Sequence, residues 1–565
     1  MKMPTLCSKG SKIPLVTLFV CIALVPIVHA QAGGFRIAGK VVSSTSGAPL
    51  SQARVTIASV EDRSATTSLI TGDDGAFVFT NLAAGKYSLA AARRGFIQSS
   101  FDQHESYATA IVTGGDADSE HLVFRLTPQS VLTGHVFDEA GDPVRKASVS
   151  LYRQDRNMGV GLTHRISGTR TDDRGIYEFA ELPAGTYFLS SYAKPWYALH
   201  PPSFPKPDGT VEMPAVAHSF DVTYATTYYP DALDSDEATP IPLRGGERLS
   251  VDMHLSPVPA LRIVVRAPVG RIDMPQLFRK SFDSMDNITT QIMEKEGPGG
   301  RVSPDFGSIR SLGRDTVELS GIPPGKYTVF VPDNAAGSGE GALAEIDLNR
   351  SGQELTPSSG APVSRLRFAV RVLGQAQIPQ GLVLALQNGE HKVVVASRVD
   401  ENGDSEFVHI PPGKYNLLAA TSANDYAVTH IVTNGGPSKG HNLEIAAGSA
   451  LEGTVTLVGG QTIVQGFAIR AGKGVPGAMI VMVPKDPEAN GELFRRDQSD
   501  LDGSFSLGTV IPGEYMIVAI ENGWDLNWSQ PSVIAHYTEK GQKVVIAPTA
   551  QEPIRLSEPV EVQPR

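Results

Sequence analysis

The chain has 565 residues, of which 41% are hydrophobic and 19% are charged, and its formal net charge is −11. This length exceeds what one hydrophobic core usually supports, so several domains are expected. The acidic balance makes nucleic acids and anionic lipids poor candidates as partners. Its 56 glycines and 40 prolines are spread between short apolar runs, which favours all-β domains with many turns.

Residues 1–30 have the three parts of a secretory signal peptide. Three lysines form a basic start, residues 13–28 form an apolar run, and "VHA" offers a cleavage site after Ala30. A retained membrane anchor is the alternative, although the apolar run is short for a membrane span. We expect export to the periplasm, the cell surface or the exterior.

Cleavage at this site removes both cysteines, Cys7 and Cys21. Disulfide bonds and thiolate metal sites are then excluded from the exported chain. It retains 46 Lys and Arg residues against 60 Asp and Glu residues, a net charge of −14. No later apolar stretch is long enough for a membrane span.

One phrase recurs five times along the chain, with a glycine followed two residues later by a tyrosine. The copies are "NLAAGKYSLA", "ELPAGTYFLS", "GIPPGKYTVF", "HIPPGKYNLL" and "VIPGEYMIVA". Their glycines, at positions 85, 185, 325, 413 and 513, are 100, 140, 88 and 100 residues apart. These are domain-sized spacings, so we expect an array of β modules. The repeated tyrosine is expected in each core, with its hydroxyl near the rim.

Other strand signals recur around this phrase. "IAGKVV", "LTGHVF" and "LEGTVTL" each resemble an opening strand, and an acidic turn later precedes an alternating strand. Pairs such as Phe77 and Phe79, or Tyr177 and Phe179, are expected on one buried face of that strand. About seven short strands in each module predict a small antiparallel β-sandwich.

The repeat predicts the following division of the chain. We expect a signal peptide at 1–30, β-sandwich modules at 31–128, 129–257, 258–345, 346–446 and 447–550, and a tail at 551–565. Within the third module, residues 273–296 have apolar positions at helical spacing, and either a helix or an irregular strand pair fits them. Residues 334–345 have the composition of a flexible loop.

The Gly-x-Val opening, the D-x-G-x-[FY] turn and the P-[AP]-G-x-Y turn together resemble the carboxypeptidase regulatory-like domain. The resemblance implies a transthyretin-like, or prealbumin-like, sandwich of the carbohydrate-binding-like fold group. It fits the first, second and fifth modules well. The fourth fits only in its second half, and the third has Arg314 and Asp315 where the acidic glycine turn belongs.

Catalytic signatures are weak throughout the chain. His441 and Glu444 match the His-x-x-Glu pattern of a zinc peptidase, but residues three apart on a strand point to opposite faces. Ser438 in "GPSKG" matches G-x-S-x-G, but it lacks the strand before it and the helix after it that a nucleophile elbow requires. We therefore expect no enzyme activity and no catalytic residue.

Two further chemistries are also not expected. The turns at 400–404 and 500–503 offer carboxylate oxygens, but no glutamate stands at the twelfth position of a calcium loop. The Lys–Asn isopeptide bonds of Cna-type relatives need a lysine in the first strand, which only Lys40 provides. We expect neither a metal ion nor any other cofactor.

Ligand binding is the remaining functional class. Trp196 and Tyr197 follow the Gly-Tyr strand of the second module, and Trp524 and Trp528 follow that of the fifth. Such rings could stack on the apolar face of a sugar, or they could cover the open end of a sandwich. Both interpretations stay open.

The sequence as a whole predicts an exported, non-enzymatic protein built from repeated β-sandwiches. Carbohydrate binding or a scaffold role in the cell envelope is the leading interpretation, with polysaccharide or envelope proteins as partners. The alternatives are a purely structural or adhesive stalk, and an accessory chain of a peptidase or of an outer-membrane transport system.

Overall fold

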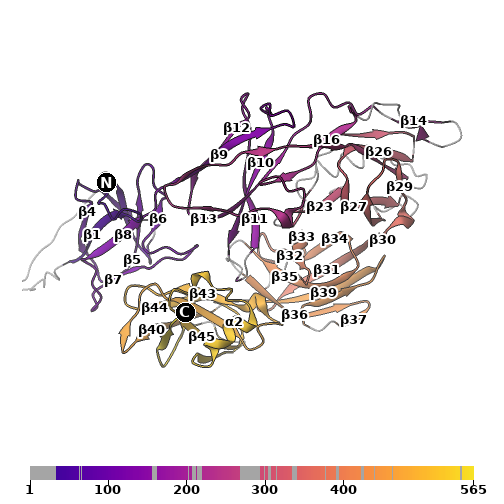
Figure 1. Cartoon of the computed structure of the whole chain (residues 1–565). Helices are drawn as coiled ribbons and strands as arrows, with labels where there is room; N and C mark the ends of the chain where they lie inside the picture. The colour runs from indigo at the N-terminus through magenta and orange to yellow at the C-terminus, as the bar shows by residue number, and fades with distance from the viewer. Residues whose placement is uncertain are drawn as a thin grey trace, which may run out of the picture.

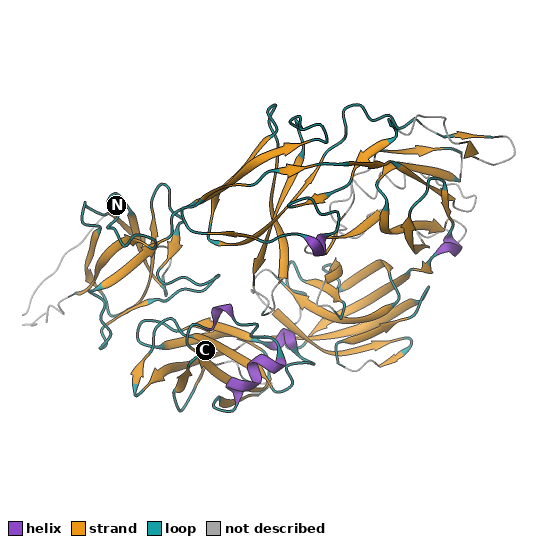
Figure 2. Ribbon diagram, viewed as in Figure 1, coloured by secondary structure: helices purple, strands orange, loops and turns teal. Residues whose placement is uncertain are grey.

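The computed structural model describes residues 34–565 except for several gaps, so residues 1–30, Ser438, residues 273–292 and residues 334–339 lie outside the described part. The undescribed positions within it are 63, 65, 156–158, 160–161, 202, 207–210, 213–218, 267–292, 298–299, 303–306, 314, 334–339, 376, 390–392, 422–424, 438–439, 461, 548–549 and 551. Residues 340–345, expected as part of a flexible loop, lie in a strand, β28 (Glu340–Leu348). The predicted fold class is confirmed: the chain is all-β and forms a tandem array of small sandwich modules (Figure 2).

The first two modules cover residues 35–126 and 130–259. The strands of module one are β1 (Phe35–Ser43), β2 (Arg54–Ser59), β3 (Thr66–Ile70), β4 (Ala76–Leu82), β5 (Gly85–Ala92), β6 (Ser99–Ser100), β7 (Ile111–Thr113) and β8 (Leu122–Leu126). Those of module two are β9 (Ser130–Phe137), β10 (Ser148–Asp155), β11 (Leu162–Arg170), β12 (Ile176–Leu182), β13 (Gly185–Tyr192), β14 (Phe204–Pro205), β15 (Val211–Glu212), β16 (Val222–Tyr224), β17 (Thr227–Tyr228), β18 (Ile241–Leu243), β19 (Arg248–Ser250), β20 (Met253–His254) and β21 (Pro257–Pro259).

Modules three and four cover residues 261–362 and 364–459. Module three contains β22 (Leu261–Arg266), β23 (Met293–Gly297), β24 (Gly300–Val302), β25 (Ser308–Ser311), β26 (Thr316–Ile322), β27 (Gly325–Asp333), β28 (Glu340–Leu348), β29 (Gln353–Leu355) and β30 (Ala361–Pro362). Module four contains β31 (Ser364–Val372), β32 (Val383–Gln387), β33 (Val393–Arg398), β34 (Asp404–Ile410), β35 (Gly413–Ala420), β36 (Asp425–Thr433), β37 (Gly436–Pro437), β38 (Asn442–Ile445) and β39 (Ala450–Gly459).

Module five covers residues 462–563 and includes an α-helix that the sequence analysis missed. Its elements are β40 (Thr462–Arg470), β41 (Lys473–Gly474), β42 (Met479–Pro484), β43 (Arg495–Gln498), β44 (Ser504–Val510), β45 (Gly513–Ile520), α2 (Pro531–Thr538), β46 (Gln542–Ile546), β47 (Ile554–Arg555) and β48 (Val560–Gln563). The signal for α2 was Pro531 at the first helical position, where its fixed φ suits a helix start. Of residues 273–296, for which a helix and an irregular strand pair were both open, only 293–296 are described, and they belong to the strand β23.

All five modules share one strand order. In module one, β1 lies between β4 and β8 in one sheet, while β2 lies between β3 and β5 in the other. The equivalent first strands β9, β22, β31 and β40 have the same neighbours, and each pairs in parallel with a strand near the end of its module. The sandwiches are thus antiparallel apart from this pairing of first and last strands and, in module five, the parallel pairing of β45 with β48.

Alternating burial produces the cores. Phe77 and Phe79 on β4 are 2% and 5% exposed, and Tyr177 and Phe179 on β12 are 1% and 5% exposed. The residues between them face solvent, so each strand offers one apolar face to the opposite sheet. Each module has its own core cluster of this kind.

Three of the expected module boundaries are wrong. Strands β28 and β29 add Leu348 and Leu355 to the core of module three, so that module continues past residue 345. "LEGTVTL" lies in β39 and places Val455 and Leu457 in the core of module four, so it closes that module instead of opening the fifth. Residues 551–565 are not a tail, because β48 buries Val560 in the core of module five.

The repeated Gly-Tyr phrase is a turn with the same hydrogen bond in every copy. The tyrosine hydroxyl donates to the backbone carbonyl four residues earlier, across the turn. The five bonds are Tyr87 to Ala83 at 3.1 Å, Tyr187 to Pro183 at 2.6 Å, Tyr327 to Pro323 at 2.8 Å, Tyr415 to Pro411 at 2.9 Å and Tyr515 to Ile511 at 2.8 Å. The spacing within the phrase is the same in all five copies because the tyrosine side chain must reach the carbonyl four residues earlier.

The residue that enters this turn has a positive φ in every module. The values are 60° at Asn81, 58° at Glu181, 76° at Gly321, 57° at His409 and 48° at Thr509. The pairing register with the first strand shifts at the same place, which marks a β-bulge. In module three only glycine fits, because a Cβ on Gly321 would lie 2.7 Å from the backbone nitrogen of Gly307.

Figure 1 shows the indigo first module close to the yellow last module, and contacts join every module to the next in a closed circuit. The representative contacts are Gln129 N to Gly95 O at 2.9 Å, Arg262 to Asp221 at 2.7 Å, Phe330 to His409 with ring centroids 4.4 Å apart, His441 to Glu492 at 3.6 Å and Lys86 to Asp500 at 2.5 Å. The last of these joins module five back to module one.

Replacing a turn tyrosine with phenylalanine tests the hydroxyl bond. Tyr515→Phe leaves the Ile511 carbonyl without its donor, and we expect a loss of about 1 kcal/mol in the local free energy of opening. Hydrogen exchange of the β45 amides in the full chain measures this loss. Tyr229→Phe is the control, since no hydrogen bond of its hydroxyl is found in the described residues; equal effects in both variants would contradict the assignment.

Candidate functional site

Trp196 is the most exposed large apolar side chain in the described residues. It lies in the loop after β13, and 87% of its surface is accessible to solvent. The neighbouring Tyr197 is half-buried, and its ring is nearly perpendicular to the indole, with centroids 5.7 Å apart and an angle of 84°. The prediction that this pair lies on a loop at the end of a sandwich is consistent with this placement.

A glutamate that the sequence analysis did not single out lies next to this pair. Glu139 follows β9 in the turn "DEAGDP", and its carboxylate accepts hydrogen bonds from the hydroxyls of Tyr197 and, at 2.8 Å, of Tyr224. We call Glu139, Trp196, Tyr197 and Tyr224 the aromatic–carboxylate site. The available signal was the acidic turn itself, in which Asp138 accepts from two backbone amides and leaves Glu139 to point outward.

The two phenols define the charge state of this carboxylate. Burial acts to raise the pKa of Glu139, but the hydrogen bonds from Tyr197 and Tyr224 outweigh it, and the pKa is lowered from its usual value. Burial and the same hydrogen bond raise the pKa of Tyr197 to about 12. At neutral pH the site therefore holds one ionised carboxylate between two neutral phenols.

The two tryptophans of module five are buried, unlike Trp196. Trp524 and Trp528 are only 8% and 6% exposed. The indole of Trp524 stacks on His104 of module one, with centroids 5.0 Å apart and an angle of 7°. Trp528 packs against Phe494 and under the guanidinium of Arg496. Neither ring offers a free face to a sugar, so in this structure they pack a contact between modules.

That contact, which we call the clasp, joins residues 86 and 101–110 of module one to residues 496–501 and 524 of module five. Two ion pairs cross it: Lys86 to Asp500 at 2.5 Å and Arg496 to Glu105 at 2.6 Å. The Arg496 and Glu105 side chains are 5% and 18% exposed. Ion pairs shielded to this degree are costly to break, because the remaining charge stays poorly solvated.

Backbone and amide hydrogen bonds continue the clasp. The Ala110 amide donates to the Asp500 carboxylate at 3.0 Å, and the Leu501 amide donates to the Ala110 carbonyl at 3.0 Å. The side-chain amide of Gln498 donates to the Asp102 carbonyl at 2.6 Å and to the Thr109 hydroxyl at 2.8 Å. Donors from both modules take part, so the two surfaces are complementary.

Each module also packs an apolar side chain against the other module at the clasp. Leu501 of module five packs against the core of module one, and Tyr107 of module one packs against the cluster that contains Trp524. The acidic turn at 500–503, weighed above as a calcium loop, is thus used for contact with module one. In the described residues, no group of three His, Cys, Asp or Glu side chains is placed to hold a metal ion.

A half-buried carboxyl group, that of Asp497 on β43, lies among the clasp residues of module five. Burial raises the pKa of Asp497 to about 6, although the Ser506 amide donates to its carboxylate at 2.6 Å. Burial likewise raises the pKa of Asp500, against the lowering effect of Lys86. Module five therefore holds an acid whose ionised form is disfavoured in the folded state.

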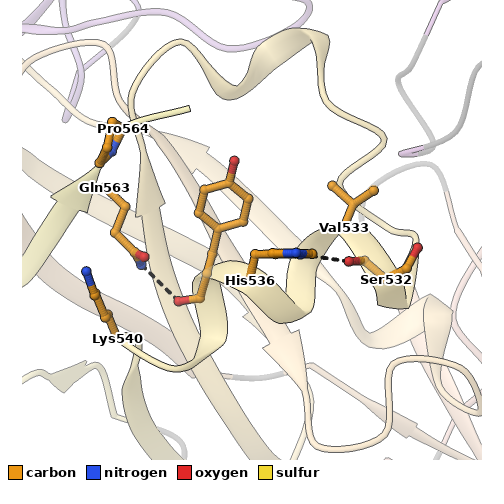
Figure 3. Close-up of a pocket in the computed structure, with 7 residues that line it drawn as sticks. Ser532, Val533, His536, Lys540, Gln563 and Pro564 are labelled. Carbon is orange, nitrogen blue, oxygen red and sulfur yellow. Dashed lines mark hydrogen bonds between the residues drawn. The ribbon is translucent and has the colours of Figure 1, made fainter.

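A shallow hollow of about 480 Å³ lies between α2 and β48 (Figure 3). His536 on the helix and Lys540, in the turn that follows it, line the hollow together with Gln563 of the last strand. The His536 ring lies 2.9 Å from the Ser532 carbonyl, and Gln563 donates to the Tyr537 carbonyl at 2.8 Å. The first contact lies within the helix, and the second joins the helix to the last strand; neither brings together a catalytic pair.

The zinc-peptidase pair is separated by the fold. His441 is 6% exposed, and its ring nitrogen lies 3.6 Å from Glu492 of module five. Glu444 lies on the exposed face of β38, opposite Lys414 in the sheet. His441 consequently belongs to the contact between modules four and five.

Comparison with known proteins identifies the family of domains to which two segments of the chain are similar. The carboxypeptidase regulatory-like domain family matches residues 36–126 and 131–195. These residues lie in modules one and two, which the sequence analysis had assigned to that family. The protein is thus one that carries carboxypeptidase regulatory-like domains. No curated protein matches the chain.

Solved structures with a partial likeness are also found. The TIE protein of Bacillus anthracis is 12% identical, with 76% of this chain and 75% of that chain covered and a TM-score of 0.17. A streptococcal ancillary pilin is 13% identical, with 54% and 100% covered and a TM-score of 0.21. The major pilin subunit BcpA of Bacillus cereus is 10% identical, with 58% and 99% covered and a TM-score of 0.13. Scores this low support no argument about this chain.

Within the described residues, no helix has both the length and the apolar character that a membrane span requires.

Removing the module-one charges should open the clasp. In Lys86→Ala/Glu105→Ala, Asp500 and Arg496 lose their partners, and we expect about 3–5 kcal/mol of destabilisation from the shielded Arg496 alone. Small-angle X-ray scattering should show a larger radius of gyration with unchanged strand content. Arg248→Ala, which removes an exposed pair with Glu178 inside module two, is the control. An unchanged radius in the double variant would refute the clasp.

Replacing Asp497 should stabilise module five in a pH-dependent way. Because the folded-state pKa is raised, protonation favours the folded state, and this contribution is lost as the pH rises through about 6. Asp497→Asn should therefore be more stable than the wild type at pH 8, by about 3 kcal/mol at most, and similar to it below pH 4. Urea unfolding at several pH values measures the difference. The exposed Glu488→Gln serves as control, and a pH-independent effect would contradict the assignment.

Proposed function

We propose that this protein is an exported, non-catalytic scaffold of the cell envelope that binds polysaccharide through Trp196. The observation that carries the proposal is the exposure of this indole, 87%, on a chain whose other two tryptophans are buried. Large exposed aromatic rings are unfavourable in water and commonly mark contact surfaces. A flat ring fits the apolar face of a pyranose.

Stacking of a sugar on Trp196 would contribute a free energy large enough to measure as a change in affinity. An aromatic side chain can bury about 150–250 Å², and covering half of that at about 25 cal/mol per Å² contributes roughly 2–3 kcal/mol. Tyr197 adds a second ring that Glu139 holds in place. Preorganised rings lose little conformational entropy on binding, so more of this contribution remains.

A purely structural role is the second candidate, and the clasp favours it. The clasp joins residues that are about 390 positions apart in sequence, and it covers Trp524 with His104 of module one. An array held in this way presents several module surfaces in fixed relation. The same contact argues against an extended stalk, in which the first and last modules would be farthest apart.

Calorimetric titration of the full chain with soluble neutral polysaccharides tests the ligand. Cellulose ethers, galactomannan and β-1,3-glucan form a suitable panel. We expect saturable binding to at least one of them, and a loss of about ten- to thirty-fold in affinity in Trp196→Ala, from the roughly 2 kcal/mol of stacking.

Phe467→Ala provides the matched control, because this ring is 51% exposed on module five, away from the aromatic–carboxylate site. Its affinity should equal that of the wild type. Trp196 fluorescence offers an independent readout, as the other two indoles are buried. No binding by any polysaccharide in the panel would leave the structural role as the function.

A further inference from the structure

We infer that Glu139 sets the charge selectivity of the aromatic–carboxylate site, which accepts amino sugars and neutral sugars and rejects sugars that carry a carboxylate. This inference rests on the proposed function, since it assigns a ligand class to the same site.

The geometry leaves Glu139 free to contact a ligand. Its side chain is exposed, and the hydroxyls of Tyr197 and Tyr224 donate to different oxygens of the carboxylate. A carboxylate oxygen has two lone pairs, so each oxygen has capacity for a second donor. A sugar hydroxyl or ammonium group stacked against Trp196 could supply that donor.

The charge on Glu139 is not neutralised by a neighbour. In the described part of the chain, no lysine, arginine or histidine forms an ion pair with it. Lys194 is the nearest cation in the sequence of the Trp196 loop, and its side chain is exposed. Asp138 lies close enough to raise the pKa of both Tyr197 and Tyr224, so it adds to the negative potential.

The charge also persists over the useful pH range. The phenol hydrogen bonds lower the pKa of Glu139, so the carboxylate is ionised at neutral and mildly acidic pH. A uronate at the site would therefore meet a fixed negative charge. An ammonium group would meet that charge and the π face of Trp196 together, since cations are attracted to indole rings.

The charge of Glu139 attracts an ammonium group and repels a uronate, and the cation–π contact with Trp196 adds to the attraction only. Each contribution is modest at an exposed site. An exposed ion pair contributes about 0.2–1 kcal/mol, and a cation–π contact contributes about 0.5–1 kcal/mol. We therefore expect amino sugars to bind about five-fold more tightly than neutral sugars, and uronates about five-fold more weakly.

Three β-1,4-linked hexasaccharides of equal length test this, built from glucose, from glucosamine and from mannuronate. Calorimetric titration of the full chain at low salt, below the pKa of the amines, should give affinities in the order glucosamine, glucose, mannuronate. At about 1 M salt, screening should bring the three affinities together. This salt test needs no variant, so it is independent of any folding defect.

Glu139→Gln supplies the residue-specific test. The amide keeps a hydrogen-bond acceptor but loses the charge, so the three affinities should fall within about two-fold of one another, while the glucose affinity changes little. Asp173→Asn removes the same charge from an exposed turn of module two, and it should keep the wild-type order.

The outcomes separate this inference from the proposed function. If the wild type binds the glucose hexamer but all three ligands bind equally, or if Glu139→Gln keeps the wild-type order, the inference is overturned and polysaccharide binding stands. If no hexasaccharide binds the wild type and the polysaccharide panel is also negative, both fail together.

Discussion

The hydrogen bonds that Asp500 accepts from Lys86 and from the Ala110 amide fix the arrangement of the whole array. Each module folds around its own core, so the cores alone would permit many relative orientations. The clasp adds a contact between the two ends of the array, and a contact of this kind restricts all the joints between them at once. Its ion pairs and its exchanged apolar side chains make that restriction energetically significant.

The clasp also explains why the tryptophans differ. Trp196 and Trp524 occupy similar places after the Gly-Tyr strand, and the sequence offers no means to distinguish their exposure. The difference arises because His104 of module one covers Trp524, while Trp196 is 87% exposed. Contacts between segments hundreds of residues apart leave no local pattern, so burial of this kind is beyond single-sequence reasoning.

Much of the fold was predictable because it repeats. Alternation around Phe77 and the Gly-Tyr turn at Tyr87 predicted the sandwich and the module count, since both depend on near neighbours in sequence. The boundaries were harder: the Gly-x-Val pattern of β39 suits a first or a last strand equally, because the two lie side by side in parallel. The carboxylate of the candidate site, Glu139, was missed because its partner Tyr224 lies 85 residues away.

The contact between the first and last modules also constrains how many modules the chain can have. In an open array, a repeat can be gained or lost by recombination with little effect on its neighbours, because each repeat depends only on the next. Here an added or deleted module would move Asp500 away from Lys86, since the intervening path would change in length and direction. Selection for the closed arrangement would therefore hold the repeat number constant, and related chains with the clasp residues should share the same number of modules.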